Sequence, residues 1–158
     1  MRFSFGSRRP PADIRIEPGD RVLAHAATGD GEHVVATDRA LYLPGGTRLP
    51  WERIDRGTWD EEGLRVTTTD GATYTARLTE PGRLPETVRE RVTASIVVTQ
   101  YVTLSRGGGV RLVARRPPAG GGDLTWEFVF DEGLDPADPG LRAHAEQALE
   151  AVRRNYGV

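Results

Sequence analysis

The sequence of 158 residues predicts an α+β fold in which short antiparallel strands precede a helix twice along the chain. The run from His33 to Leu78 alternates short apolar stretches with turn residues. After Leu84, apolar residues recur at every fourth position, which is the period of a helix face. A second helical stretch, started by proline, runs from Asp138 to Tyr156. We therefore expect a curved antiparallel sheet or partial barrel capped by a helix, then a three-stranded antiparallel meander and a C-terminal helix.

The first strands are expected to follow an extended arm at residues 1–19, which carry three prolines and little periodicity. Gly29-Asp30-Gly31 predicts a hairpin with a three-residue loop, and Asp70-Gly71 predicts a two-residue hairpin. Because proline cannot donate to a strand ladder, the strand that contains Pro50 is expected either to be an edge or to begin after the proline. The expected strands of this part are Arg21–Thr28, His33–Thr37, Ala40–Leu43, Arg48–Arg56, Leu64–Thr68 and Tyr74–Leu78.

A helix should begin at Leu84, with Pro85 in its first turn, where a missing N–H costs nothing. Its buried stripe is predicted to consist of Leu84, Val88, Val92 and Ile96. This gives a first domain at residues 20–96 and a second at residues 97–158, packed on the first. The second domain should hold strands at Val97–Leu104, Val110–Arg115 and Leu124–Phe130, followed by the final helix. Trp126 is predicted to be a core residue that packs under that helix, against Leu149 and Val152.

The composition excludes several classes of chemistry. The chain has no cysteine, which removes disulfides, thiolate metal sites and cysteine nucleophiles. All 21 basic residues are arginine, so lysine-based catalysis is excluded as well. The net charge of −2 is spread evenly and lacks the basic excess that drives nucleic-acid binding. With no long apolar stretch and no signal-like segment, we expect a cytoplasmic protein without membrane insertion.

Three segments carry a family resemblance: Gly19-Asp20-Arg21-Val22-Leu23, Val35-Ala36-Thr37-Asp38-Arg39-Ala40-Leu41-Tyr42 and Leu49-Pro50-Trp51-Glu52-Arg53-Ile54. Through them, residues 20–96 resemble the pleckstrin-homology-like (PH-like) domains of bacteria, especially of high-GC Gram-positive species. The resemblance implies a bent sheet with a helix at one end. It also implies a scaffold that binds lipid headgroups, peptides or sister subunits, without shared catalytic residues. The first hairpin, Thr28 to Glu32, is acidic here, which argues against phosphoinositide binding.

Two groups of residues invite a catalytic hypothesis. His25 and His33 should lie diagonally on one sheet face, about 7–8 Å apart, near Asp30 or Glu32. They would suit a divalent metal and a metal-assisted hydrolase, but no third ligand is evident, so two half-exposed strand histidines are the alternative. The acidic run Asp60 to Glu62 fits a solvated turn better than a general acid–base pair. We predict no catalytic residue, no metal ligand and no cofactor.

The predicted function is a non-catalytic binding or scaffold module that engages a protein partner or itself, because an open edge strand recruits partners by strand addition. Its candidate binding residues are Trp51, expected to be half-exposed, with Arg53 and Ile54 on the strand that Pro50 marks. Arg115 and Arg116 are further candidates, placed before a Pro-Pro step that a partner could read. The alternative is a small-ligand or anionic-headgroup binding domain, which requires the arginines near Trp51 to converge on a concave pocket.

Overall fold

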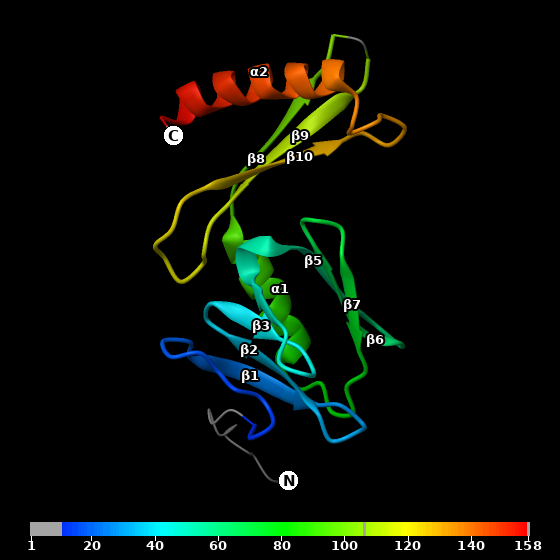
Figure 1. Ribbon diagram of the computed structural model, residues 1–158, viewed down its shortest axis with the longest axis vertical. Coiled ribbons are helices and arrows are strands. Elements are labelled where there is room, and N and C mark those ends of the chain that lie inside the picture. Colours follow the sequence, from blue (N-terminus) through cyan, green and yellow to red (C-terminus); the bar gives the residue numbers. More distant parts are fainter. Residues whose placement is uncertain (1–10, 106, 158) are drawn as a thin grey trace. The chain divides into compact units, whose positions relative to one another are not determined.

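The computed structural model describes residues 11–105 and 107–157 and has the predicted α+β class. Within those residues there are one four-stranded and two three-stranded antiparallel sheets, with two α-helices (Figure 1). The chain divides into two compact units. The first unit holds the residues up to Ser95 together with Arg116–Asp123, and the second holds Ile96–Arg115 and the residues from Leu124 onward.

The first unit begins with a four-stranded sheet whose strands follow one another in sequence order: β1 (Val22–Ala27), β2 (His33–Thr37), β3 (Ala40–Tyr42) and β4 (Arg48–Pro50). The predicted three-residue loop between β1 and β2 is confirmed. Ala27 lies opposite His33, and the Thr28 N–H donates to the Glu32 carbonyl at 2.8 Å. β4 ends the sheet, so Pro50 stands on an edge strand as predicted.

The predicted strand Arg48–Arg56 is interrupted. A single turn of 3-10 helix, η1 (Trp51–Arg53), separates β4 from the second sheet. That sheet consists of β5 (Ile54–Asp60), β6 (Gly63–Thr68) and β7 (Thr73–Ala76), again in sequence order. The loop at Asp70-Gly71 is longer than predicted, because the Thr68 N–H donates to the Ala72 carbonyl and leaves three residues between them. The two sheets do not close into a barrel.

Helix α1 (Leu84–Ser95) contacts β1 and β2 of the first sheet and β5 of the second. Leu84, Val88 and Val92 are buried as predicted, and they join both sheets in one apolar core. Ile96 was predicted to extend this stripe, and that is wrong. The helix ends at Ser95, and Ile96 begins the next strand with 37% of its surface exposed.

The described part of the predicted arm, residues 11–19, covers the outer face of the four-stranded sheet. Ile14 is 4% exposed and packs with Val22, Val35 and Tyr42 in a second apolar cluster. Residues 1–10 of the predicted arm lie outside the described residues.

The second unit is the predicted meander: β8 (Ile96–Thr103), β9 (Gly109–Arg115) and β10 (Thr125–Phe130), with β9 in the middle. Helix α2 (Pro139–Tyr156) lies on one face of this sheet (Figure 1). As predicted, Trp126 packs with Leu149 and Val152 in one cluster, although it is half-buried rather than enclosed. The Asp138 side chain caps the helix by accepting from the N–H groups of Gly140 and Leu141.

Candidate functional site

Trp51 was predicted to be half-exposed, and this is wrong. Its side chain is fully buried, and its indole Nε1–H donates to the Thr37 carbonyl at 2.8 Å. The physical cause is the turn η1, which redirects the chain directly after Pro50 and points the indole into the core. A buried tryptophan whose N–H is satisfied is a packing residue rather than a surface anchor.

The neighbours of Trp51 do not form an exposed apolar patch either. Ile54 is fully buried in the same core, so its expected place on a binding surface is also wrong. Arg53 is exposed, and its carbonyl accepts the N–H of Thr69 at 2.8 Å. Of the three candidates, the structure leaves only the Arg53 side chain available to a partner.

Arg115 and Arg116 lie in different environments. Arg115 is 3% exposed, and its Nε lies 3.4 Å from a carboxylate oxygen of Glu127 on the neighbouring strand β10. Arg116 is exposed, and its N–H donates to the Ser95 carbonyl at 3.0 Å. The two guanidinium groups therefore do not form one clamp. This agrees with the sequence, because adjacent residues of an extended chain direct their side chains to opposite faces.

A partly buried polar cluster, which sequence reasoning missed, joins Asp20, Tyr42 and Arg48. The Tyr42 hydroxyl donates to Asp20 Oδ2 at 2.6 Å, and Arg48 donates to both Asp20 oxygens at 3.1 and 3.2 Å. Burial alone would raise the pKa of Asp20, but the hydrogen bonds from Arg48 and Tyr42 outweigh it and hold the pKa below its usual value. Burial and the Asp20 carboxylate raise the pKa of Tyr42.

This cluster gives a pH-dependent prediction. The pKa of Asp20 is lower in the folded protein than in the unfolded chain. The ionised carboxylate therefore stabilises the fold at any pH above the unfolded pKa of about 3.9, and this contribution is lost as the pH falls through the folded-state pKa. Asp20→Asn should therefore be less stable than the unmodified protein at neutral pH, and the gap should shrink on acidification. Urea unfolding at a series of pH values measures this gap. The exposed carboxylate variant Asp123→Asn is the control, and a gap that stays constant down to pH of about 2 would contradict the assignment.

A small hollow of about 260 Å³ lies beside the β4 edge, and arginines near Trp51 do meet there. It is lined by Arg39, Arg48, Pro50 and Glu52 and by the loop from Pro117 to Gly122. Arg48 is already paired with Asp20, however, and the Glu52 carboxylate adds a negative charge. Of the two described arginines that line the hollow, Arg39 forms no ion pair, but its charge already helps to lower the pKa of Asp20, so the hollow does not favour an anionic headgroup.

The two histidines lie as predicted, side by side on adjacent strands, with ring centroids 6.4 Å apart. His33 Nδ1 lies 2.8 Å from a carboxylate oxygen of Asp13, which belongs to the segment that the sequence did not connect to the hairpin. Within residues 11–105 and 107–157, no group of three or more histidine, aspartate or glutamate side chains comes together as a metal site would require.

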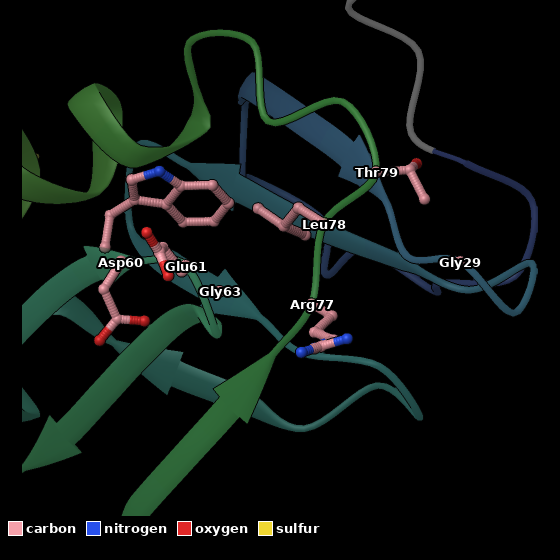
Figure 2. A pocket seen from close by; sticks show the side chains of 8 residues that line it. Gly29, Asp60, Glu61, Gly63, Arg77, Leu78 and Thr79 are labelled. Atoms are coloured by element: carbon pink, nitrogen blue, oxygen red, sulfur yellow. The ribbon is translucent and has the colours of Figure 1, made fainter.

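A larger hollow of about 720 Å³, called the Trp59 hollow here, lies where the β5–β6 hairpin faces the segment after β7. Asp60 and Glu61 line one side and Arg77 the other, with Leu78 between them (Figure 2). Trp59 lines it as well and is 39% exposed. The remaining lining residues are Gly29, Gly63 and Thr79. The sequence analysis placed the acidic run on a solvated turn but did not connect it with Trp59 and Arg77.

Strand β10 presents an open backbone edge. The Asp131 N–H donates to the Gly109 carbonyl at 3.0 Å, and Phe130 lies opposite Val110. Since bonded pairs alternate along an antiparallel ladder, Val129, Glu127 and Thr125 direct their backbone groups toward β9. The N–H and C=O groups of Trp126, Phe128 and Phe130 therefore point away from the sheet.

The other edge strands carry features that discourage pairing. β4 has three residues and contains Pro50, and β7 has four residues. β1, β5 and β8 each contain a register shift. β10 has six residues in unbroken register and contains neither proline nor glycine. Short length, proline and bulges are three of the devices by which proteins protect sheet edges, and β10 has none of these three, although it carries one charged residue, Glu127.

Comparison with family models, with curated proteins and with solved structures finds no match. The resemblance of residues 20–96 to PH-like domains therefore stays a prediction. Neither helix of the described residues is long and apolar enough to cross a membrane.

Proposed function

We propose that this protein is a non-catalytic binding module that associates with a second copy of itself through strand β10. The observation that carries the proposal is the open edge of β10. The outward backbone groups of Trp126, Phe128 and Phe130 have no described backbone partner there. Two such edges that meet antiparallel about a two-fold axis form a continuous six-stranded sheet, because each copy contributes its three strands.

The side chains of β10 support a pairing with itself. Trp126, Phe128 and Phe130 belong to the core beneath α2 but remain half-buried, because no described strand pairs with the outer side of β10. A second β10 would cover their open side and bury more aromatic surface, the dominant favourable contribution to association. Arg142 stacks on the Phe128 ring at 5.7 Å and has its own counter-ion in Glu146, so this arginine brings no unpaired charge to the edge.

The charged side chains select one register. Only outward-facing residues can form the bonded pairs between the two copies, so Phe128 can face Phe128 of the other copy while Trp126 faces Phe130. In that register Glu127 lies opposite Val129 of the other copy. A shift of the pairing by two residues in one direction places Glu127 opposite Glu127 of the other copy. A shift in the other direction places Glu127 opposite Asp131 of the other copy. Both alternatives are disfavoured, because like charges directly opposite one another are destabilising. The register centred on Phe128 is therefore the one we expect.

Paired cysteines test this register directly, because the chain has no cysteine of its own. Glu127 and Val129 of the two copies would form a non-bonded pair, whose Cα atoms lie about 4.5 Å apart, within the range of a disulfide. The double variant Glu127→Cys/Val129→Cys should give a dimer that survives denaturation under oxidising conditions. Glu127→Cys alone should stay monomeric on the same gel, since its partner cysteine lies about 7–8 Å away on the diagonal.

Hydrogen exchange supplies the second measurement. Raising the protein concentration should slow hydrogen exchange at the outward amides of Trp126, Phe128 and Phe130. Over the same concentrations, the sedimentation coefficient should rise to that of a dimer. The outward amides of the opposite edge strand β8, Thr99 and Tyr101, serve as internal controls and should not change. A protein that remains monomeric at high concentration, or a dimer that protects β8 instead, would refute association through β10.

A further inference from the structure

We propose that the Trp59 hollow binds small zwitterions of the amino-acid type. The cationic group would lie against Trp59, near the negative charges of Asp60 and Glu61, and the anionic group would pair with Arg77. This site is separate from β10 and does not depend on the proposed self-association. It lies wholly within the first unit.

Trp59 supplies a face that attracts cations. It is the most exposed of the three tryptophans, since Trp51 is fully buried and Trp126 is half-buried in the core under α2. The face of an indole ring attracts an ammonium or guanidinium group within about 6 Å. Asp60 and Glu61 follow it directly in the chain and also line the hollow, so their negative charges add to the attraction for an organic cation, although the Asp60 side chain leaves the opposite face of β5 from Trp59.

The charges of the hollow are divided between two sides. Asp60 and Glu61 stand opposite Arg77 (Figure 2), and no ion pair with Arg77 is formed by the described residues. Glu61 likewise accepts no hydrogen bond from the described part of the chain. Asp60 accepts the Glu62 N–H at 2.8 Å, which fixes the turn. A ligand that carries one charge of each sign satisfies both sides, whereas a simple cation or anion satisfies only one.

The sides of the hollow are held by contacts away from the charges. The Thr79 N–H and hydroxyl both donate to the Ala27 carbonyl, at 3.1 and 3.3 Å, which ties the segment after β7 to strand β1. Leu78 packs against the apolar core of the first unit and offers an apolar surface between the charged sides. A preformed site loses less entropy on binding, which favours a small ligand.

The size of the hollow fits the same class of ligand. Its volume of about 720 Å³ falls within the range of about 300–1,000 Å³ that small-molecule sites occupy. A free molecule of the amino-acid type carries its cation and its carboxylate only a few bonds apart. The terminus of a peptide offers one of the two charges, so we expect the free zwitterion to bind more tightly than either peptide end.

Three probes of nearly the same shape separate the contributions. Glycine betaine has a trimethylammonium group and a carboxylate, choline has only the cation, and 3,3-dimethylbutyrate replaces the ammonium nitrogen by carbon and keeps the carboxylate. Isothermal titration of the full chain should give saturable binding of glycine betaine. Loss of the cation in dimethylbutyrate should weaken binding about tenfold or more, since desolvated cation–π contacts are worth up to about 2 kcal/mol. Choline should bind more weakly than betaine.

Matched variants locate the site. Asp60→Asn/Glu61→Gln and Trp59→Leu should each weaken betaine about tenfold, and Arg77→Gln should make betaine and choline bind alike. The controls are Glu62→Gln and Arg65→Gln, because these side chains pair with each other at 3.4 Å and do not line the hollow. Circular dichroism checks that each variant is folded. No saturable betaine binding, equal binding of betaine and dimethylbutyrate, or equal losses in the control variants would each overturn the proposal.

Discussion

Replacing Trp51 by alanine should destabilise the protein by about 3–5 kcal/mol, which is the usual cost of truncating a buried tryptophan. The indole is fully buried in the core that joins both sheets of the first unit to α1. Its N–H also satisfies the Thr37 carbonyl at 2.8 Å, and that acceptor would lose its partner. Because natural domains are stable by only about 5–15 kcal/mol, the variant should unfold at much lower denaturant concentration.

Trp59→Ala is the matched control, because the same substitution is made at a tryptophan with 39% exposure. Surface substitutions usually change stability by no more than about 0.5 kcal/mol, and this side chain should cost little more than that. Urea unfolding of both variants, followed by far-UV circular dichroism, measures the difference. Similar losses in the two variants would show that Trp51 is not the core residue that its burial indicates.

Gly63→Ala should also be strongly destabilising, by about 3 kcal/mol or more, because two costs add at this position. Gly63 has a φ of 118°, a backbone conformation that residues other than glycine rarely adopt. A Cβ atom there would lie 2.4 Å from the Ala76 carbonyl oxygen and 3.0 Å from the Arg77 Cα. These are backbone atoms of the last residue of β7 and of the residue after it, so relief requires that this segment and β6 move apart.

Gly71→Ala separates the two costs. Gly71 also has a positive φ, 90°, but a Cβ atom added there would meet nothing within 4 Å. This control should lose only the backbone contribution, about 1 kcal/mol. The excess loss in Gly63→Ala then reports the close approach of β6 to β7. Equal melting temperatures for the two variants would contradict that reading.

Local chemistry explains which elements the sequence could predict. The loop at Gly29–Gly31 and the C-terminal helix depend on residues that act within a few positions. Asp138 caps the helix, Pro139 starts it, and Gly157 ends it with a φ of 70°. The apolar face of β10 follows from alternation alone. In each case the signal and the structure that it specifies lie in the same short segment.

The candidate sites depend on neighbours that no local pattern specifies. Alternation shows which side chains of β10 share a face, but it does not show that β10 pairs with a described strand on one side only. Trp51 was expected to be half-exposed because it lies beside Pro50 and Arg53, whereas the turn η1 buries its indole in the core. The Trp59 hollow joins residues from Gly29 to Thr79, which meet because Thr79 bonds to Ala27, far away in the sequence.

The division of the chain into units has a consequence for any attempt to separate them. The path passes from one unit to the other three times, after Ser95, after Arg115 and after Asp123. At the first crossing, α1 gives way to β8 without a single intervening residue. A fragment that stops at Ser95 would therefore lack residues 116–123 of its own unit, and one cleavage cannot release either unit intact. Limited proteolysis should yield either the whole chain or nicked chains that stay together, and dissection by truncation should give incomplete folds.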